Sequence, residues 1–304
     1  MSWLSKLFNK KIVPTTNGVA VQDLYNRNPE KEFKRTQKDA ASQLEFLTTE
    51  HYYKKYLKPG MRILDAGGGP GRYTLEFAKM GCHVTLADIA EKELDFAREQ
   101  IRENGLNEFV DSVDCASITK LPYKANSFDA VFCVGGPLSH VRTAKERASA
   151  VNELIRVAKS GAPIFISVMG RPAVLNLLAK DWKDYLAEYN YKTDDDFWTE
   201  NKRLAYEGDD LWFVGCSYAH FFWPTELREL VMKTNKVDFL HMIGLEWSRQ
   251  NCKQEFNEFM ADESRRKEWM KIHYDLSEHP DMVSLSPHVM IVVRKKRATT
   301  KKAK

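Results

Sequence analysis

A glycine-rich turn between two acidic residues carries most of the chemistry in this sequence. Four glycines fill positions 67–69 and 71, directly after a short apolar run that ends near Asp65. A second apolar run ends at Asp88, 23 residues after Asp65. Because glycine has no Cβ and adopts positive φ at little cost, such a turn lets the backbone approach a bulky ligand. An acid at the end of the following strand suits the ribose diol of a nucleotide.

The spacing of the turn separates two kinds of ligand. A dinucleotide fingerprint has the form G-x-G-x-x-G, and counting from Gly67 and Gly69 places Arg72 where its third glycine belongs. The pattern present is acid-x-G-x-G-x-G. Asp65 directly before the turn would repel a pyrophosphate, whereas it suits a ligand that carries ammonium and sulfonium groups.

Strands and helices alternate around this turn. We expect strands near 62–65, 83–88, 109–113, 127–134 and 163–168, with helices over 72–80, after Asp88, and from a capping box at Thr143–Glu146. This alternation predicts a mainly parallel sheet, whose ligands lie at the carboxyl ends of the strands. Four residues fall at those ends and are predicted to share one site: Asp65, Asp88, Asp114 and Gly135.

Over residues 20–168 the sequence resembles the class I S-adenosylmethionine-dependent methyltransferases, whose first motif has the acid-x-G-x-G-x-G form. Residues 121–129 and 152–161 resemble the segments that precede the fourth and fifth strands of that family. The resemblance implies an α/β, doubly wound, mainly parallel seven-stranded sheet of Rossmann-like type, closed by strands near 239–245 and 288–294. It implies S-adenosyl-L-methionine as methyl donor. The cofactor-binding residues that it implies are Asp65, Gly67, Gly68, Gly69, Gly71, Arg72, Asp88, Ile89, Asp114, Cys115, Cys133 and Gly135.

The family also implies which part of the cofactor each residue holds. The first acid and the glycines hold the methionine part, and Asp88 takes both ribose hydroxyls with Ile89 beside the adenine. Asp114, followed by Cys115, would reach the adenine amino group. Residues 133–135 would lie beneath the methionine end.

Several polar residues have two readings that the sequence leaves open. His140 follows the fourth strand and is the candidate general base, since neutral imidazole accepts a proton; it could instead orient its loop. Arg72 could steer a carboxylate or form an ion pair at the start of a helix. Tyr25 and Arg35 could close over the cofactor or simply pack their helices.

Residues 171–223 contain 13 aromatic residues, interrupted by acidic clusters. We expect a helical, aromatic-rich cap inserted into the fold. Its aromatic side chains could wall a flat apolar acceptor, with His220 as a polar group, or form the core of the insertion itself.

Composition limits the remaining options. The chain has 304 residues, a formal net charge of +4 concentrated in its final residues, and five cysteines without metal-binding spacing. We therefore expect a cytoplasmic protein with reduced thiols, no metal, and no nucleic-acid partner for the folded body. No apolar run reaches the about 20 residues of a membrane span, and we expect no signal peptide.

The expected organisation has five parts. A flexible or amphipathic segment (1–19) precedes the cofactor-binding core with its cover helices (20–170), the cap (171–223), the C-terminal part of the core (224–294) and a basic disordered tail (295–304). Residues 1–13 could associate weakly with a membrane surface, or pack or fray. The tail could bind RNA, phospholipid or an import receptor, or stay solvated.

The expected function is methyl transfer by direct displacement to an oxygen or nitrogen of a small, apolar or aromatic acceptor, because an aromatic cap suits a compact substrate. One alternative is an RNA or protein methyltransferase that docks through its basic tail. Another is a protein that binds S-adenosylmethionine without transferring its methyl group. The sequence indicates neither the acceptor nor the oligomeric state.

Overall fold

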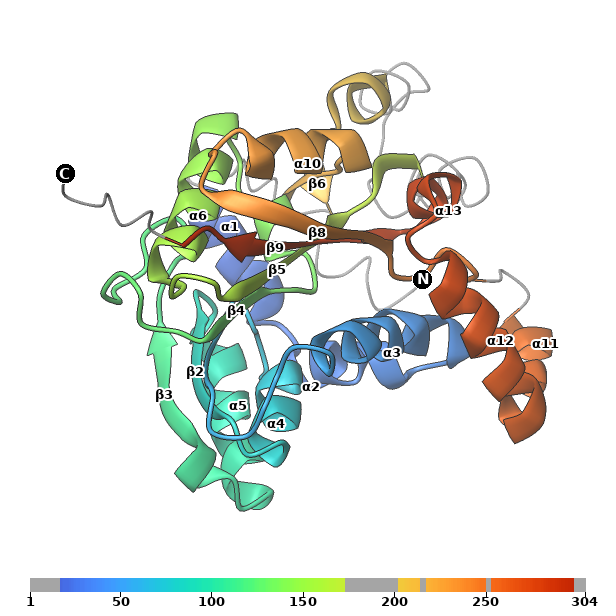
Figure 1. The fold of residues 1–304 in the computed structure, drawn as a ribbon, viewed down its shortest axis with the longest axis horizontal. Coiled ribbons are helices and arrows are strands. Elements are labelled where there is room, and N and C mark those ends of the chain that lie inside the picture. Colours follow the sequence, from blue (N-terminus) through green and yellow to red (C-terminus); the bar gives the residue numbers. More distant parts are fainter. Residues whose placement is uncertain (1–16, 173–201, 214–216, 250–252, 298–304) are drawn as a thin grey trace, which may run out of the picture.

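The computed structural model describes residues 17–172, 202–213, 217–249 and 253–297, and its centre is a seven-stranded sheet (Figure 1). The strands follow the order β3 (Val110–Cys115), β2 (His83–Asp88), β1 (Arg62–Ala66), β4 (Ala130–Cys133), β5 (Pro163–Met169), β9 (His288–Lys295) and β8 (Val237–Gly244). The first five run parallel, and β9 is antiparallel to both β5 and β8. This arrangement confirms the predicted fold class.

Helices cover both faces of the sheet, and the period-two alternation of β5 shows how its residues divide between them. Every residue of β5 is buried. Ile164 and Ile166 face one core with α6 (Ala144–Val157) and α10 (Pro224–Met232), while Phe165 faces the opposite core. The opposite core also receives α3 (Ala40–Tyr53), α4 (Arg72–Lys79) and α5 (Glu91–Glu103). A strand buried on both faces reads as a continuous apolar run, which is why the sequence predicts it so readily.

The helix boundaries follow local sequence signals. Thr143 and Glu146 form the predicted capping box at the start of α6. Gly71 precedes α4 in a left-handed conformation, at φ +80°. Short 3₁₀ helices stand at Arg35–Gln37 (η2), Asn107–Phe109 (η3) and Pro137–His140 (η4).

Two N-terminal helices, α1 (Asn17–Tyr25) and α2 (Pro29–Phe33), pack on α5. The α1 helix also contacts β7 (Ser217–His220), and the Gln22 side-chain amide donates to the carbonyl oxygen of Ile89 at 2.6 Å. The α1 helix therefore lies next to the carboxyl end of β2.

Only part of the expected cap lies within the described residues. Residues 202–207 are helical, and β6 (Asp209–Phe213) pairs with β7 in a two-stranded antiparallel sheet. The prediction of a mostly helical cap did not include this strand pair. Many of the aromatic residues on which the cap was predicted lie outside the described residues, including Trp182, Tyr185, Tyr189, Phe197 and Trp198.

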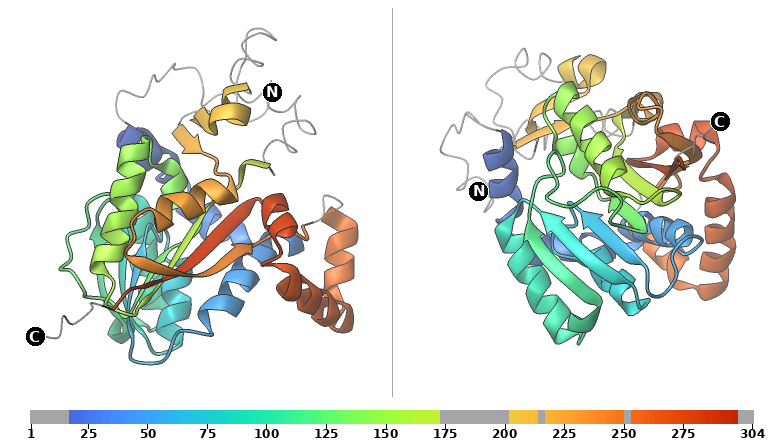
Figure 2. Two further views of the ribbon diagram at one scale, coloured as in Figure 1. Left: turned by 45° about the horizontal axis from the view of Figure 1, so that its top comes forward. Right: turned by 60° about the vertical axis from the view of Figure 1, so that its left-hand side comes forward.

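Between β8 and β9 the chain forms α11 (Lys253–Ala261), α12 (Glu263–Leu276) and α13 (Pro280–Leu285). Phe256, Met260 and Met270 pack on Leu44, so α11 and α12 lie beside α3 at one end of the molecule (Figures 1 and 2). The expected amphipathic segment 1–13 and most of the basic tail fall outside the described residues. None of the described helices is both long and apolar enough to cross a membrane.

Candidate functional site

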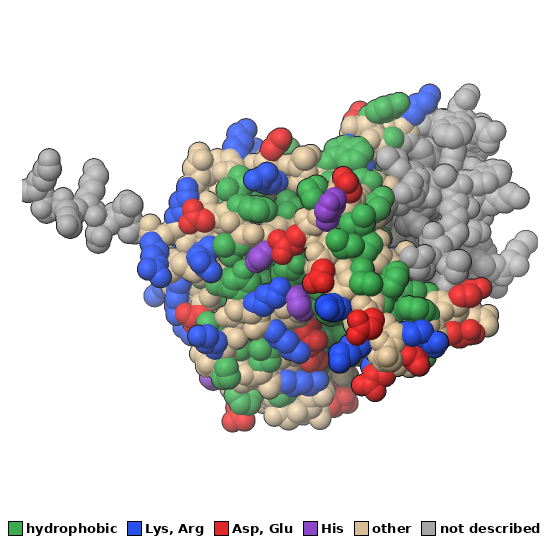
Figure 3. Space-filling view, turned by 45° about the vertical axis from the view of Figure 1, so that its right-hand side comes forward, with side chains coloured by type: hydrophobic (Ala, Val, Ile, Leu, Met, Phe, Trp, Pro, Cys, Tyr) green, Lys and Arg blue, Asp and Glu red, His purple; other side chains and the backbone are tan. Residues whose placement is uncertain are grey.

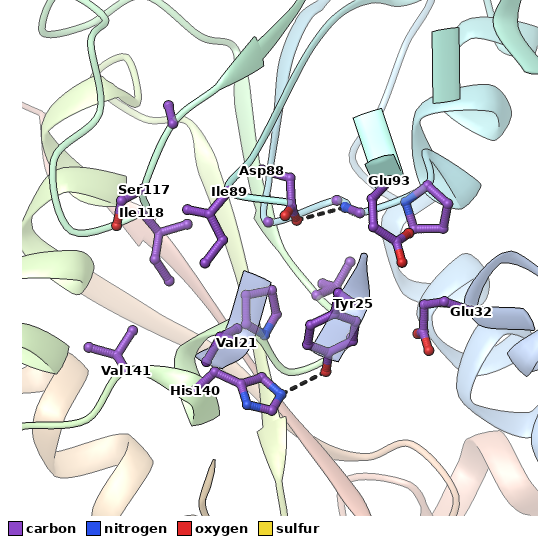
Figure 4. A pocket seen from close by; sticks show the side chains of 18 of the residues that line it. Val21, Tyr25, Glu32, Asp88, Ile89, Glu93, Ser117, Ile118, His140 and Val141 are labelled. Carbon is purple, nitrogen blue, oxygen red and sulfur yellow. Dashed lines mark hydrogen bonds between the residues drawn. The ribbon is translucent and has the colours of Figure 1, made fainter. Parts of the chain in front are cut away.

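A pocket of about 310 Å³ lies at the carboxyl ends of β1, β2 and β4, under α1 and α2 (Figure 4). This volume falls at the lower end of the range for small-molecule sites. Its walls include the glycine turn (Gly67, Gly68, Gly69, Pro70), residues at the sheet end (Asp88, Ile89, Val134, Gly135, Pro137, His140, Val141), the segment Ala116, Ser117, Ile118 and Thr119, and the residues Val21, Tyr25, Glu32, Arg35, Arg72 and Glu93.

The glycines of the turn serve two different purposes. A Cβ on Gly67 would come 2.5 Å from Pro137 Cβ, and one on Gly68 would come 2.5 Å from Asp65 Cγ. These two glycines are therefore needed for the turn to pack against η4 and against Asp65. Gly69 borders the pocket, and its N–H donates to Asp88 Oδ2 at 2.9 Å.

Asp65 lies beneath the turn and does not line the pocket. Its side chain is fully buried, Thr74 Oγ1 donates to its Oδ2 at 2.7 Å, and its Oδ1 has no hydrogen-bond partner within the described part of the chain. Burial raises the pKa of Asp65 to about 6. Asp65 thus packs beneath the turn against Gly68, and its contact with the methionine part stays a prediction.

Asp88 is the predicted acid that does face the pocket. Gly69 N–H and Ala90 N–H each donate to one of its carboxylate oxygens at 2.9 Å. Ile89 follows it in the wall, and Ile118 lies across from Ile89 (Figure 4). The site therefore combines a carboxylate with two apolar side chains that can hold a flat ring.

Four further predicted cofactor residues do not line the pocket: Gly71, Asp114, Cys115 and Cys133. Strand β3 runs to Cys115, which pairs with Asp88, so the wall is formed by the residues that follow it. The Asp114 carboxylate accepts hydrogen bonds from Ser112 and Tyr123, both at 2.8 Å. Residues 116–119 therefore form the pocket wall next to Asp114, and the contact of Asp114 with the adenine stays a prediction.

His140 ends η4 and is almost completely buried. Its Nδ1 lies 3.0 Å from the carbonyl oxygen of Tyr218, which can only accept, so Nδ1 carries the proton. Its Nε2 then accepts from the Tyr25 hydroxyl at 2.7 Å (Figure 4). Burial lowers the pKa of His140 to about 4, which keeps the ring neutral near pH 7.

Arg35 and Tyr25 both line the pocket, and their closure over the cofactor stays a prediction. Two acids fix the guanidinium of Arg35 in place. Its Nε donates to Glu32 at 2.7 Å, and its Nη1 and Nη2 donate to the two carboxylate oxygens of Glu45 at 2.5 and 3.2 Å. Paired side chains of this kind lose little additional freedom when a ligand binds.

Glu45, Glu246 and His288 bring ligand-type atoms within 4.8 Å of one another among the described residues. The Glu45 carboxylate already forms an ion pair with Arg35. The Glu246 carboxylate pairs with Arg249 at 2.9 Å and with His288 Nδ1 at 2.5 Å. The positive and negative groups of this cluster compensate one another. We therefore interpret it as an ion-pair network that anchors Arg35 rather than as a metal centre.

Arg72 forms the ion pair of its second reading, and the steering of a carboxylate stays a prediction. It lines the pocket and pairs with Glu76 at 3.4 Å, while its guanidinium lies 4.4 Å from the ring centre of Phe46. His220 has a structural environment instead, buried between Asp209 at 2.6 Å and Glu226 at 2.7 Å, and it does not line the pocket.

Glu93 is a pocket residue that the sequence did not indicate. An acid in the first turn of a helix is ordinarily explained by the helix dipole, so nothing marked it out. Its side chain is 1% exposed, and neither carboxylate oxygen has a hydrogen-bond partner within the described residues. Burial, followed by the charges of Glu32 and Asp88, raises the pKa of Glu93 to about 9.

Part of the chain is similar to known methyltransferases. Residues 63–161 match the family model described as a methyltransferase domain. The ubiquinone/menaquinone biosynthesis C-methyltransferase of Vibrio parahaemolyticus is 33% identical over 134 residues, covering 42% of this chain and 48% of that protein. The corresponding enzyme of Shewanella sediminis is 33% identical over 118 residues, covering 38% and 45%. The chain thus matches about half the length of these curated relatives.

Solved structures share the fold at low identity. An S-adenosylmethionine-dependent methyltransferase from Methanosarcina mazei aligns with a TM-score of 0.52 at 20% identity, over 81% of this chain and 97% of that one. The 1,6-didemethyltoxoflavin N1-methyltransferase of Burkholderia thailandensis aligns with a TM-score of 0.53 at 14% identity, over 92% and 88%. A [4+2]-cyclase aligns with a TM-score of 0.52 at 18% identity, over 83% and 80%.

The sheet order, the glycine turn beside Asp88 and the matched family model agree with one another. Residues 63–161 therefore match a methyltransferase domain, and the fold is shared with a solved S-adenosylmethionine-dependent methyltransferase.

Proposed function

We propose that this protein is an S-adenosylmethionine-dependent methyltransferase that acts on a small-molecule acceptor. The observation that carries the proposal is the meeting of the glycine turn, Asp88 and the Tyr25–His140 pair in one pocket. The methyltransferase names of the relatives support it, although they match over about half their length.

The residues present fit the cofactor. Each carboxylate oxygen of Asp88 accepts a hydrogen bond from one backbone N–H. Because an ionised carboxylate has about four acceptor sites, sites remain for the ribose hydroxyls. Ile89 and Ile118 would hold the adenine, and residues 67–69 the methionine end. Arg35 would face the carboxylate of the cofactor. When bound, S-adenosylmethionine supplies a methyl group that is already activated on a sulfonium centre.

The Tyr25–His140 pair supplies a route for a proton. The acceptor would donate its proton to the Tyr25 oxygen while the Tyr25 proton moves to His140 Nε2, and the resulting imidazolium would keep its Nδ1 hydrogen bond to Tyr218. His140 is a weak base, but the acceptor proton becomes far more acidic as the methyl group arrives. A neutral imidazole is therefore sufficient, and burial keeps it neutral.

The acceptor that best suits this pair is a small ring compound with an ionisable hydroxyl or N–H group. The named relatives methylate carbon, and removing a proton from a ring hydroxyl raises the electron density of the adjacent ring carbon. Carbon therefore joins the oxygen and nitrogen expected from the sequence as an acceptor atom. All three outcomes use the same proton acceptance by Tyr25 and His140.

Two alternatives make different predictions. A nucleic-acid or protein methyltransferase would need a basic docking surface, and the face in Figure 3 intersperses lysine and arginine with acidic side chains. Such an enzyme would show strong salt dependence and would lose activity on removal of residues 295–304. A protein that binds S-adenosylmethionine without transfer would form no demethylated product; a [4+2]-cyclase shares the fold, so the fold alone does not decide this.

The test uses methyl-labelled S-adenosylmethionine with a fractionated cell extract. We expect label in a small-molecule fraction with matching formation of S-adenosylhomocysteine, and loss of both in the Asp88→Ala variant. The Glu91→Gln variant is the matched control, since Glu91 is an exposed acid of α5 that does not line the pocket. Label found only in the macromolecular fraction, or none with any fraction, would contradict the proposal.

A further inference from the structure

The Glu93 side chain lines the pocket, and the proposed function does not use it. It is the third residue of α5, and its Oε2 would lie 3.5 Å from a Cβ placed on Gly69. Figure 4 shows its carboxyl group turned into the pocket, on the side where Glu32 also faces. A carboxyl group in this position is 1% exposed and borders the same turn as Asp88.

The hydrogen-bond partners of the two acids differ. Both oxygens of Asp88 accept from backbone N–H groups, whereas neither oxygen of Glu93 has a partner within the described residues. A buried polar group without a partner is costly, so a site that retains one suggests that a ligand supplies the missing hydrogen bonds.

The surroundings restrict the chemistry of that ligand. The charged groups that influence Glu93 are Glu32 from α2 and Asp88 from the end of β2, so an anionic group is disfavoured. The charge of Glu32 is already matched by Arg35 at 2.7 Å. Burial and these two acids also favour the protonated form of Glu93, which both donates and accepts hydrogen bonds. Hydroxyl groups fit these conditions.

Gly69 fixes where those hydroxyl groups would lie. Its N–H donates to Asp88 Oδ2, and Glu93 Oε2 lies 3.5 Å from where a Cβ on Gly69 would be, so both acids border Gly69. Two neighbouring carboxyl groups can each take one hydroxyl of a vicinal diol. We propose that Glu93 is a second ribose-binding residue, which together with Asp88 holds the diol of the nucleoside cofactor.

This inference rests on the proposed function, because the ribose belongs to the proposed cofactor. It is tested by calorimetric titration of the full chain with S-adenosylhomocysteine and with its 2′-deoxy and 3′-deoxy analogues. The variants are Glu93→Leu, which removes the hydrogen-bonding group, Glu93→Gln, which keeps one, and Glu91→Gln as the control on the same helix. Circular dichroism spectra establish that each variant is folded.

For the wild type, we expect one of the two deoxy analogues to bind about tenfold more weakly than S-adenosylhomocysteine. For Glu93→Leu, the same analogue should bind less than about twofold more weakly than S-adenosylhomocysteine. Glu93→Gln should bind S-adenosylhomocysteine within about threefold of the wild type, whereas Glu93→Leu should bind about tenfold more weakly. The Glu91→Gln control should match the wild type throughout.

Failure of this inference can be distinguished from failure of the proposed function. Wild-type protein that does not bind S-adenosylhomocysteine overturns both. If the wild type binds S-adenosylhomocysteine and Glu93→Leu loses as much affinity for each deoxy analogue as the wild type does, only the role of Glu93 is overturned. The role of Glu93 in ribose binding would also be overturned if Glu93→Leu kept the wild-type loss of affinity for both deoxy analogues but lost a preference for S-adenosylmethionine over S-adenosylhomocysteine. Glu93 would then contact the positive charge of the cofactor.

Discussion

Replacing Glu93 by glutamine should stabilise the ligand-free protein, and the gain should grow with pH. The pKa of Glu93 rises from an ordinary 4.5 to about 9 on folding, because the group is buried beside Glu32 and Asp88. The folded state therefore binds this proton more tightly than the unfolded state. Between these two pKa values the free energy of unfolding falls as pH rises, and it is unaffected by this group below pH 4.5.

The magnitude follows from the same shift. When the folded state binds one more proton than the unfolded state, the free energy of unfolding falls by about 1.4 kcal/mol for each unit by which the pH rises. We expect about half of this, because the carboxyl group borders a pocket that water can enter, which gives about 2 kcal/mol between pH 5 and pH 8. Glutamine keeps the shape of the side chain and removes its titration.

The assay is urea unfolding of wild type and Glu93→Gln, followed by circular dichroism at pH 5, 6, 7 and 8. The difference in unfolding free energy should be near zero at pH 5 and should favour the variant by about 2 kcal/mol at pH 8. Glu91→Gln should show no such trend, since Glu91 is 54% exposed. A difference that is constant with pH, or a variant less stable than wild type at pH 8, would refute the reasoning.

Three further predictions concern the site. Tyr25→Phe and His140→Ala should each lower kcat about 10²-fold while binding of S-adenosylhomocysteine changes little, measured by initial rates and calorimetry; turnover of His140→Ala that is unchanged across pH would exclude the base. Asp88→Ala should weaken S-adenosylhomocysteine binding about 100-fold in calorimetry, and an unchanged Kd would remove Asp88 from the site. Thr74→Val should destabilise the protein by about 1–3 kcal/mol in urea unfolding, because it takes away the hydrogen bond to buried Asp65; equal stability would show that Thr74 does not hold it.

The sequence predicted those parts of the site that depend on local pattern. The strand ends at Asp65 and Asp88, the glycine turn between them and the capping box of α6 all follow from residues close together in the chain. His140 was found in the same way, because it follows the fourth strand by a short loop.

The parts that were missed depend on contacts between distant segments. The pairing of β2 with β3 decides that residues 116–119, and not Asp114, form the pocket wall. The hydrogen bond between Tyr25 and His140 joins residues 115 positions apart, and it forms because α1 brings the Tyr25 hydroxyl to the end of η4. Glu93 looks like an ordinary first-turn acid until folding buries it beside Glu32 and Asp88.

The proposed activity is the transfer of a methyl group to a small molecule in this pocket. The most direct measurement is mass spectrometry of S-adenosylhomocysteine and of methylated products, after incubating wild-type, Tyr25→Phe and Glu91→Gln proteins with S-adenosylmethionine and a small-molecule fraction. We predict a new compound heavier by one methylene unit, formed in step with S-adenosylhomocysteine by the wild type and Glu91→Gln, and about 10²-fold more slowly by Tyr25→Phe. Product formed equally fast by Tyr25→Phe, or S-adenosylmethionine bound without any methylated small molecule, would contradict the account.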